Sequence, residues 1–237
     1  NKMRLRKSHV SRFLEGKAGM LERMSTDETS LSIYTADELL RLAAEGNTAV
    51  IRGWGANHLM ATIPHVIRVR VCAPLALRVE RMMERLNTKD RAFVEKEVQL
   101  SDEAIGAIAK RHFNVDWRDA AHYDIIVSTE RNSIEDCAAA ILAVAAKPNF
   151  AETSESRGKL NDMAISAHIR AALRNDENTR KLDIMADASG GQVTLIGMVG
   201  SDKLVAQVVD LVSKTPGVTS VNNQLNSGRR FGKTDDL

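Results

Sequence analysis

The chain has 237 residues, of which 43% are hydrophobic, 27% charged and only 4% aromatic. This length is nearly twice that of a common domain, which favours two domains that each bury a core. Lys and Arg number 33 against 31 Asp and Glu, and this net charge of +2 is too small to indicate a nucleic-acid partner. The longest apolar run, 137–146, is too short to span a bilayer and no secretory signal pattern is present, so we expect a cytoplasmic protein.

Apolar segments rich in β-branched residues alternate with helical patterns over the first 147 residues. Strands are expected over 48–52, 66–72 and 123–128, with a helix over 75–86. The segments between the strands are long enough for crossover connections, and the strands read as nearly continuous Val and Ile runs. The sequence therefore predicts a first domain over 1–147 of the α/β class, with a mostly parallel sheet.

A polar segment that contains both proline and glycine, residues 148–158, is predicted to be a linker. A second domain is expected over 159–226, followed by a disordered tail over 227–237. Its expected elements are a helix over 161–173, strands over 182–187 and 192–199, a helix from Ser201 or Asp202, and a strand over 218–225. This order, αββαβ, predicts a small α+β domain.

The sequence contains no phosphate-binding loop of the form G-x-x-x-x-G-K-[ST]. The nearest segment, 228–234, is one residue too short and lies in the polar tail, so we assign no phosphate site to it. The turn Gly53-Trp54-Gly55 follows the strand expected over 48–52, and ligands of open α/β sheets bind at the carboxyl ends of strands. It is therefore a candidate site, although a tight turn that needs a positive φ at one glycine is the simpler interpretation.

Several segments resemble the cytidylate kinase-like family in their order and spacing. They are VIRGWGAN at 50–57, VRVCAP at 69–74 with Arg78 and Arg81 after it, HFNVDW at 112–117 and YDIIVST at 123–129. The resemblance covers residues 35–146 and implies a parallel-sheet P-loop kinase fold, incomplete at its N-terminus in this chain. It also implies an activity in which ATP, with Mg²⁺, donates its γ-phosphoryl group to a nucleoside monophosphate such as cytidine monophosphate.

The same resemblance implies roles for individual residues. The glycine turn matches the family's G-R-G motif near the acceptor nucleotide, and two arginines match those that reach the donor and acceptor phosphates. An acidic residue matches one in the helical lid. The implied nucleotide-binding residues are Arg52, Gly53, Gly55 and Asn57, and the implied catalytic residues are Arg78, Arg81 and Asp102.

The sequence also departs from the family pattern. Trp54 stands in place of the G-R-G arginine, although Arg52 is close enough to compensate, and Ile105 stands where an arginine usually follows the lid aspartate. The chain opens with Asn1, so the P-loop is expected either upstream of it or lost. Two interpretations stay open: a cytidylate kinase-like enzyme, inactive as this chain alone, or a protein with a degenerate kinase fold that senses a nucleotide or binds lipid or protein.

The second domain resembles the BON domain of bacterial osmotic-stress and envelope proteins. The segments that carry the resemblance are GQVTLIG at 191–197 and GVTSVN at 217–222, with Val199 and Ser201 between them. The resemblance implies binding of phospholipid membranes or small ligands without catalysis. His168 on the first helix of this domain is expected to be an ordinary surface or half-buried residue.

No metal site is expected. His112 and Asp116 are four residues apart, a spacing that allows both to share a helix face, but two ligands do not make a structural metal site. The sequence leaves the oligomeric state open.

Overall fold

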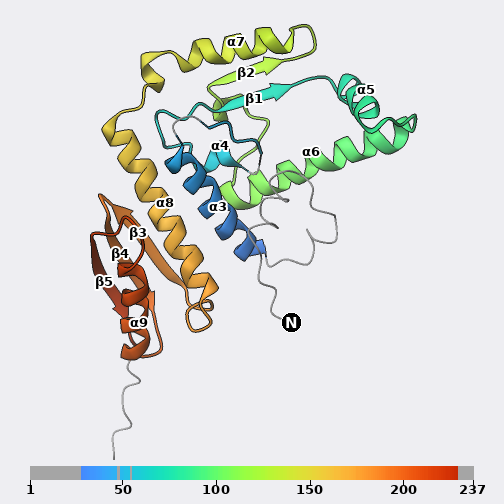
Figure 1. Ribbon diagram of the computed structural model, residues 1–237. Helices are drawn as coiled ribbons and strands as arrows, with labels where there is room; N and C mark the ends of the chain where they lie inside the picture. Colours follow the sequence, from blue (N-terminus) through green and yellow to red (C-terminus); the bar gives the residue numbers. More distant parts are fainter. Residues whose placement is uncertain (1–27, 47–48, 54, 229–237) are drawn as a thin grey trace, which may run out of the picture. The chain divides into compact units, whose positions relative to one another are not determined.

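The structure is a computed structural model that describes residues 28–46, 49–53 and 55–228 (Figure 1). The chain divides into two compact units, one of residues 1–51 with 157–237 and one of residues 52–156. In the described ranges no helix is long and apolar enough to cross a bilayer.

Residues 52–156 contain a parallel pair of strands, β1 (Val69–Cys72) and β2 (Ile125–Ser128), in the register Val69↔Ile125 to Cys72↔Ser128. A parallel pair needs a crossover connection, and the helices α5 and α6 supply it. The helical elements of this unit are α4 (Ala56–Leu59), α5 (Leu75–Leu86), α6 (Arg91–Phe113), η1 (Ala120–His122), α7 (Ile134–Ala145) and η2 (Pro148–Phe150).

The helices α5 and α6 form a hairpin whose turns are set by local chemistry. Helix α5 ends at Asn87, whose φ of 49° is a left-handed conformation that asparagine tolerates well. Helix α6 begins after Asp90, whose carboxylate accepts a hydrogen bond from Phe93 N at 3.0 Å. The two helices pack through Val79 and Val94, which have no exposed surface, so the hairpin has its own small apolar core.

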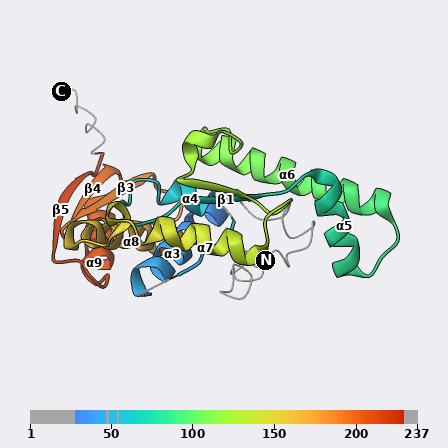
Figure 2. The ribbon, with the colours of Figure 1, turned by 90° about the horizontal axis from the view of Figure 1, so that it is seen from above.

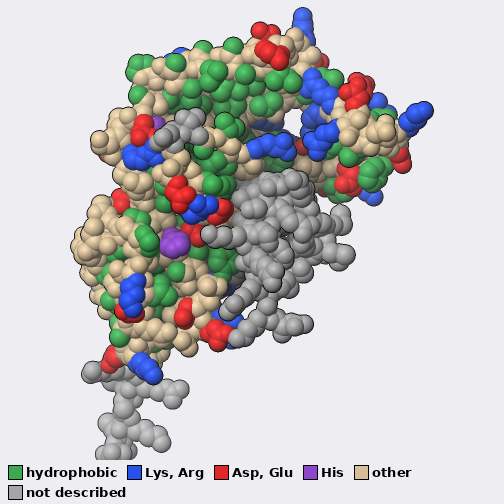
Figure 3. Space-filling view, viewed as in Figure 1, with side chains coloured by type: hydrophobic (Ala, Val, Ile, Leu, Met, Phe, Trp, Pro, Cys, Tyr) green, Lys and Arg blue, Asp and Glu red, His purple; other side chains and the backbone are tan. Residues whose placement is uncertain are grey.

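An apolar surface covers α7 and the strands beside it (Figure 3). Ile134 and Leu142 of α7 are 73% and 67% exposed, and Val71 of β1 and Ile126 of β2 are 61% and 41% exposed. Cys137 of α7 is buried, and its thiol donates to Ser128 O at 3.6 Å. Helix α7 therefore packs on β2 with one face and leaves an apolar face open among the described residues.

The other unit contains α3 (Glu28–Glu45), the main part of α8 (Ser154–Asn175) and a three-stranded sheet with α9. The strands are β3 (Ile184–Ser189), β4 (Gln192–Met198) and β5 (Ser220–Asn226), and α9 is Asp202–Ser213. In the order β3-β4-β5, β3 pairs antiparallel and β5 parallel with β4, and α8 and α9 lie alongside the sheet (Figure 2).

The core of this sheet follows the alternation of the sequence. The side chains that pack between the sheet and the two helices include Ile169, Ala186, Val193, Leu195 and Val208, each with no exposed surface. Because every second residue of β3 and β4 points inward, the predicted αββαβ domain forms around one continuous core. The predicted fold class, a parallel-sheet α/β domain followed by a small α+β domain, is confirmed.

The predicted strands of the first domain are too long. Of 48–52, the described residues 49–52 form no strand, Val50 is 98% exposed, and none of the described strands pairs with this segment. The strand expected over 66–72 begins only at Val69, since Arg68 N donates to the Asp124 carboxylate at 2.8 Å and not to a neighbouring strand. The strand expected over 123–128 begins at Ile125 because Tyr123 N closes the turn of η1 on Ala120 O.

The predicted linker is partly helical. Residues 148–150 form η2, and α8 begins at Ser154 and not at 161. Thr153 and Ser156 exchange hydrogen bonds, with Ser156 N to Thr153 Oγ1 at 3.1 Å and Thr153 N to Ser156 Oγ at 3.0 Å. This reciprocal cap starts the helix early. The tail predicted over 227–237 and the segment 228–234 lie outside the described residues beyond position 228.

Candidate functional site

Arg78 on α5 and Asp102 on α6 form a two-pronged ion pair. Nη1 and Nη2 of Arg78 donate to Oδ1 and Oδ2 of Asp102, both at 2.8 Å, and the two side chains are 35% and 21% exposed. The hydrogen bond to Asp102 outweighs burial and raises the pKa of Arg78. The Nε of Arg78 is buried and has no hydrogen-bond partner among the residues that the structure describes. The sequence assigned both residues to the site, and the structure brings them together.

Arg81 lies one turn further along α5, on the same side as Arg78. Its Nη1 donates to Thr129 Oγ1 at 2.7 Å and its Nη2 donates to Thr129 O at 2.8 Å. Thr129 directly follows β2, and its N–H donates to Cys72 O at the end of β1. Arg81 is therefore fixed at the carboxyl end of the parallel strands, where ligands of such sheets bind.

The glycine turn caps α4. Gly55 has a φ of 72°, and its carbonyl accepts hydrogen bonds from His58 N at 2.9 Å and Leu59 N at 2.8 Å. A Cβ on Gly55 would stand 2.4 Å from the ring of Phe113 at the end of α6. Gly53 has a φ of 90° and open space around it. Both positions thus require glycine, while Arg52 beside them is exposed and Trp54 lies outside the described residues.

An aromatic cluster holds the other side of α4. The His58 ring lies 5.4 Å from the Phe113 ring, 5.3 Å from the His122 ring and 6.5 Å from the Tyr123 ring, measured between centroids. Asn57 Nδ2 is 3.4 Å from His58 Nε2. Burial, followed by the charges of His122 and Arg68, lowers the pKa of His58. Sequence reasoning named Asn57 but missed both histidines, because no local pattern signals a contact between residues so far apart in the chain.

The predicted site residues fall into two groups along α6. Arg78 and Arg81 lie with Asp102, whereas the glycine turn contacts Phe113, which is 11 residues, or about 16 Å, further along the same helix. The sequence also missed Thr129, although it stands at the end of the segment 123–129 that carried the resemblance. In the described part of the chain, no three His, Cys, Asp or Glu side chains gather as a metal-binding group.

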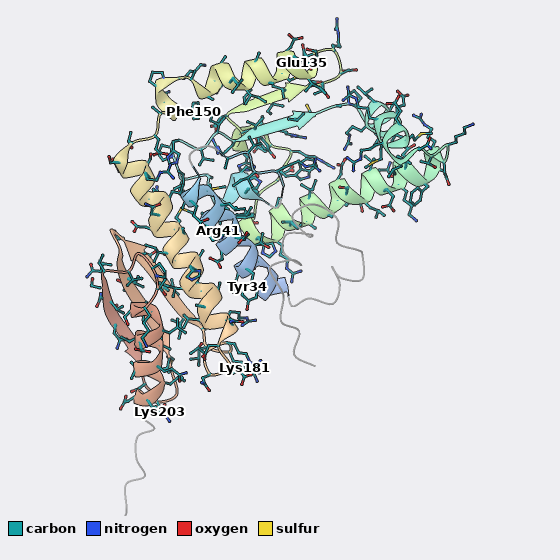
Figure 4. All side chains as sticks on the ribbon, in the orientation of Figure 1. Tyr34, Arg41, Glu135, Phe150, Lys181 and Lys203 are labelled. Carbon is teal, nitrogen blue, oxygen red and sulfur yellow. The ribbon has the colours of Figure 1, made fainter. Side chains whose placement is uncertain are left out.

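A cavity of about 610 Å³ lies in the other unit, between α3, α8, the β3–β4 turn and the loop before β5. On one side Arg41 of α3 pairs with Glu38 at 2.7 Å and with Glu45 (Figure 4). His168, which the sequence treated as ordinary, lies 3.1 Å from Asp37 through its Nδ1. The sequence gave no sign of this cavity, since its walls come from four separate segments.

The turn between β3 and β4 forms another wall of the cavity. Both carboxylate oxygens of Asp162 on α8 accept hydrogen bonds from this turn, from Gly190 N at 2.9 Å and Gly191 N at 3.1 Å. These bonds fix the turn against the helix.

Comparison with known proteins agrees with this architecture. The BON domain model matches residues 161–228, which include β3, β4, α9 and β5. The comparison with curated proteins gives no match. The model of the cytidylate kinase-like family matches residues 2–131, more than half of the chain, and the protein therefore belongs to the cytidylate kinase-like family.

Proposed function

We propose that the kinase-like domain transfers the γ-phosphoryl group of ATP to a nucleoside monophosphate of the cytidylate type. The observation that carries the proposal is the pair Arg78 and Arg81, one turn apart on α5, each held in a fixed orientation by oxygen atoms. Phosphoryl transfer depends mainly on positioning and on neutralising phosphate charge, which is what oriented arginines provide. Both substrates are cytoplasmic metabolites, which supports the expected cytoplasmic location.

Both arginines keep N–H groups for a ligand. A guanidinium carries five N–H donors, and Asp102 uses one on each Nη of Arg78, so the second hydrogen of each Nη is free to meet a phosphate oxygen. Thr129 likewise accepts one hydrogen bond from each Nη of Arg81, so each Nη keeps its second hydrogen for a phosphate oxygen. The partners fix the plane of each guanidinium before a ligand arrives, which lowers the entropic cost of binding.

The residues present fit a nucleotide with its magnesium. Mg²⁺ is commonly bound by substrate phosphates, water and one or two carboxylates, so a cage of three protein ligands is not required. When bound, Mg²⁺-ATP would supply the phosphoryl group and part of the charge neutralisation. The turn formed by Gly53 and Gly55, with Arg52 and Asn57 on either side, would contribute backbone and polar side-chain contacts to the acceptor nucleotide.

A second candidate is nucleotide binding without transfer. It is favoured by Ile105, which is 45% exposed on α6 at the place where the family usually has an arginine, and by Trp54 in the glycine turn. An apolar side chain at either position removes a donor that would stabilise transferring charge. Binding would still be served by Arg78 and Arg81.

Calorimetry and a coupled ADP assay on the full chain separate these candidates. We expect cytidine monophosphate and Mg²⁺-ATP to bind, and ADP to form only when both are present and the domain also carries a phosphate-binding loop at its N-terminus. Arg81→Ala should weaken binding or turnover by about tenfold to a hundredfold, the effect of losing charge-assisted hydrogen bonds. The control Arg91→Ala removes an exposed arginine that forms a long ion pair of 3.8 Å with exposed Glu80. Binding without ADP formation by a form of the protein that carries such a loop would support the second candidate, and no binding of either nucleotide would overturn both.

For the BON module we propose binding of a small ligand or a phospholipid headgroup in the cavity between α3 and α8. Its volume of about 610 Å³ is that of a typical small-molecule site. Gly158 lines the cavity, and a side chain there would meet nothing within 4 Å, so Gly158→Phe should fill the space. Gly200→Phe is the matched control, because Gly200 is equally open but does not line the cavity. Co-sedimentation with liposomes should fall for the first variant only.

A further inference from the structure

The glycine turn depends on packing for its position. Helix α4 has only four residues, which is too short to be stable by itself. Ala56 and Met60, both 4% exposed, anchor its apolar side. The opposite side is held by His58, whose ring packs against residues of α6 and η1. His58 is thus the contact through which α4 reaches these two elements.

His58 and the glycine turn share one neighbour. The Phe113 ring faces the His58 ring at 5.4 Å and also lies directly against the Cα of Gly55. In addition, the backbone N–H of His58 donates to Gly55 O at 2.9 Å. A displacement of the His58 ring therefore moves the turn by two routes, through Phe113 and through the backbone.

We infer that His58 is a positioning residue: as a neutral imidazole it holds Gly55 and α4 against α6 and η1, and its protonation releases them. This inference rests on the proposed function only for its consequence, a weaker binding of the acceptor nucleotide at low pH.

The groups that face His58 explain why the neutral ring is required. His122 comes from η1, Tyr123 from the segment before β2, Phe113 from α6 and Arg68 from the segment before β1. The charges of His122 and Arg68 both oppose a proton on His58. A protonated His58 would repel both, and the repulsion is strong because the ring is partly buried.

Neither Asp124 nor Asp116 is among the causes that shift the pKa of His58, and both interact with its neighbours. Asp124 is engaged by Arg68, which donates to it from N at 2.8 Å, Nε at 3.1 Å and Nη2 at 2.7 Å. Asp116 acts on Tyr123, where its charge raises the pKa of the phenol, although burial is the main cause of that shift. Burial, His122 and Arg68 accordingly lower the pKa of His58, and the ring is neutral at pH 7.

Amide hydrogen exchange on the full chain tests the positioning role without any nucleotide. After correction for the intrinsic pH effect, we expect peptides that span 53–61 to lose protection between pH 7.5 and 5.5. His58→Phe keeps an uncharged ring and should stay protected at both pH values, whereas His58→Ala should lose protection at both. His112→Phe, an exposed histidine next to Phe113, is the control and should respond like the wild type. Equal protection of the wild type at both pH values, or a pH response retained by His58→Phe, would overturn the inference.

Calorimetry with cytidine monophosphate tests the consequence for binding. The phosphate of the ligand itself titrates near pH 6, so His58→Phe serves to measure that part of the pH effect. Relative to this variant, we expect the affinity of the wild type to fall from pH 7.5 to 5.5 by less than about tenfold, because the pKa of His58 lies below its ordinary value of 6.5. An equal fall in both proteins would overturn the link between His58 and binding. If no variant binds the nucleotide at any pH, the proposed function fails, and the exchange result still decides the role of His58.

Discussion

Arg78 and Asp102 join α5 to α6 by two parallel hydrogen bonds of 2.8 Å between charged groups. The pair lies in a hairpin whose apolar contacts come from Val79, Val94 and a few neighbours, so the ion pair is a sizeable part of what holds the two helices together. It also fixes the guanidinium that we propose to meet a phosphate. The same contact therefore has a structural and a functional consequence, and the two can be measured separately.

Asp102→Asn should lower the stability of the kinase-like domain by about 1–3 kcal/mol, because it leaves the half-buried guanidinium of Arg78 without its charged partner. Urea denaturation followed by tryptophan fluorescence measures this domain selectively, since both tryptophans, Trp54 and Trp117, lie in it. Glu103→Gln, at the exposed neighbouring position, is the control and should change stability by less than about 0.5 kcal/mol. Equal effects of the two substitutions would show that the ion pair contributes nothing.

Gly55→Ala should be more destabilising than Gly53→Ala. Both glycines have positive φ, 72° and 90°, so alanine costs about 1–2 kcal/mol of backbone strain at either position. At Gly55 the new methyl group would also stand 2.4 Å from Phe113, which has to move, whereas at Gly53 it would meet nothing within 4 Å. The difference between the two variants in the same fluorescence assay isolates the contact with Phe113. A difference near zero would mean that this ring does not pack on the turn.

Asp124 should make the domain sensitive to acid. The hydrogen bond from Arg68 is the main cause that lowers the pKa of Asp124 below its ordinary value of 3.8. A carboxylate with a lowered pKa contributes stability that is complete above about pH 4 and is lost as the pH falls through the folded-state pKa. Asp124→Asn should therefore be less stable at pH 7 and should lose less stability than the wild type between pH 4 and pH 2. Parallel pH profiles for the two proteins would contradict the prediction.

Strong local patterns in the sequence predicted much of the fold. The order of the elements expected over 161–225 defined the second domain, and the helix over 75–86 was found with its observed bounds. The pairing of Arg78 with Asp102 follows from the family resemblance, which placed both residues at one site. These features rest on residues that lie close together or on a shared pattern.

The remaining features depend on contacts that local patterns do not encode. The strand expected over 48–52 has the right composition, but composition does not supply a neighbouring strand. The start of α8 was hidden because Gly158 suggested a linker, while the cap formed by Thr153 and Ser156 decided the outcome. His58 and His122 meet because η1 and α4 both approach the end of α6, and no sequence pattern in either segment predicts that contact.

The hairpin of the BON module provides a test within its own unit. Gly191 is buried with a φ of 79°, and a Cβ there would stand 2.8 Å from Gly217 O, a backbone atom that cannot rotate away. Gly190 has a φ of 58°, and a Cβ added there would meet no atom within 4 Å. Gly190→Ala should therefore cost about 1–2 kcal/mol of strain alone, and Gly191→Ala considerably more, because the loop before β5 has to shift. Hydrogen exchange of β4 amides in the full chain measures both effects without relying on tryptophan, which this module lacks. Equal exchange in the two glycine variants would contradict the close approach of Gly217 to Gly191.

Asp162 accepts hydrogen bonds from both turn amides, Gly190 N and Gly191 N. Asp162→Ala should therefore increase hydrogen exchange at Gly190 and Gly191 and leave the amides of the β4 core protected.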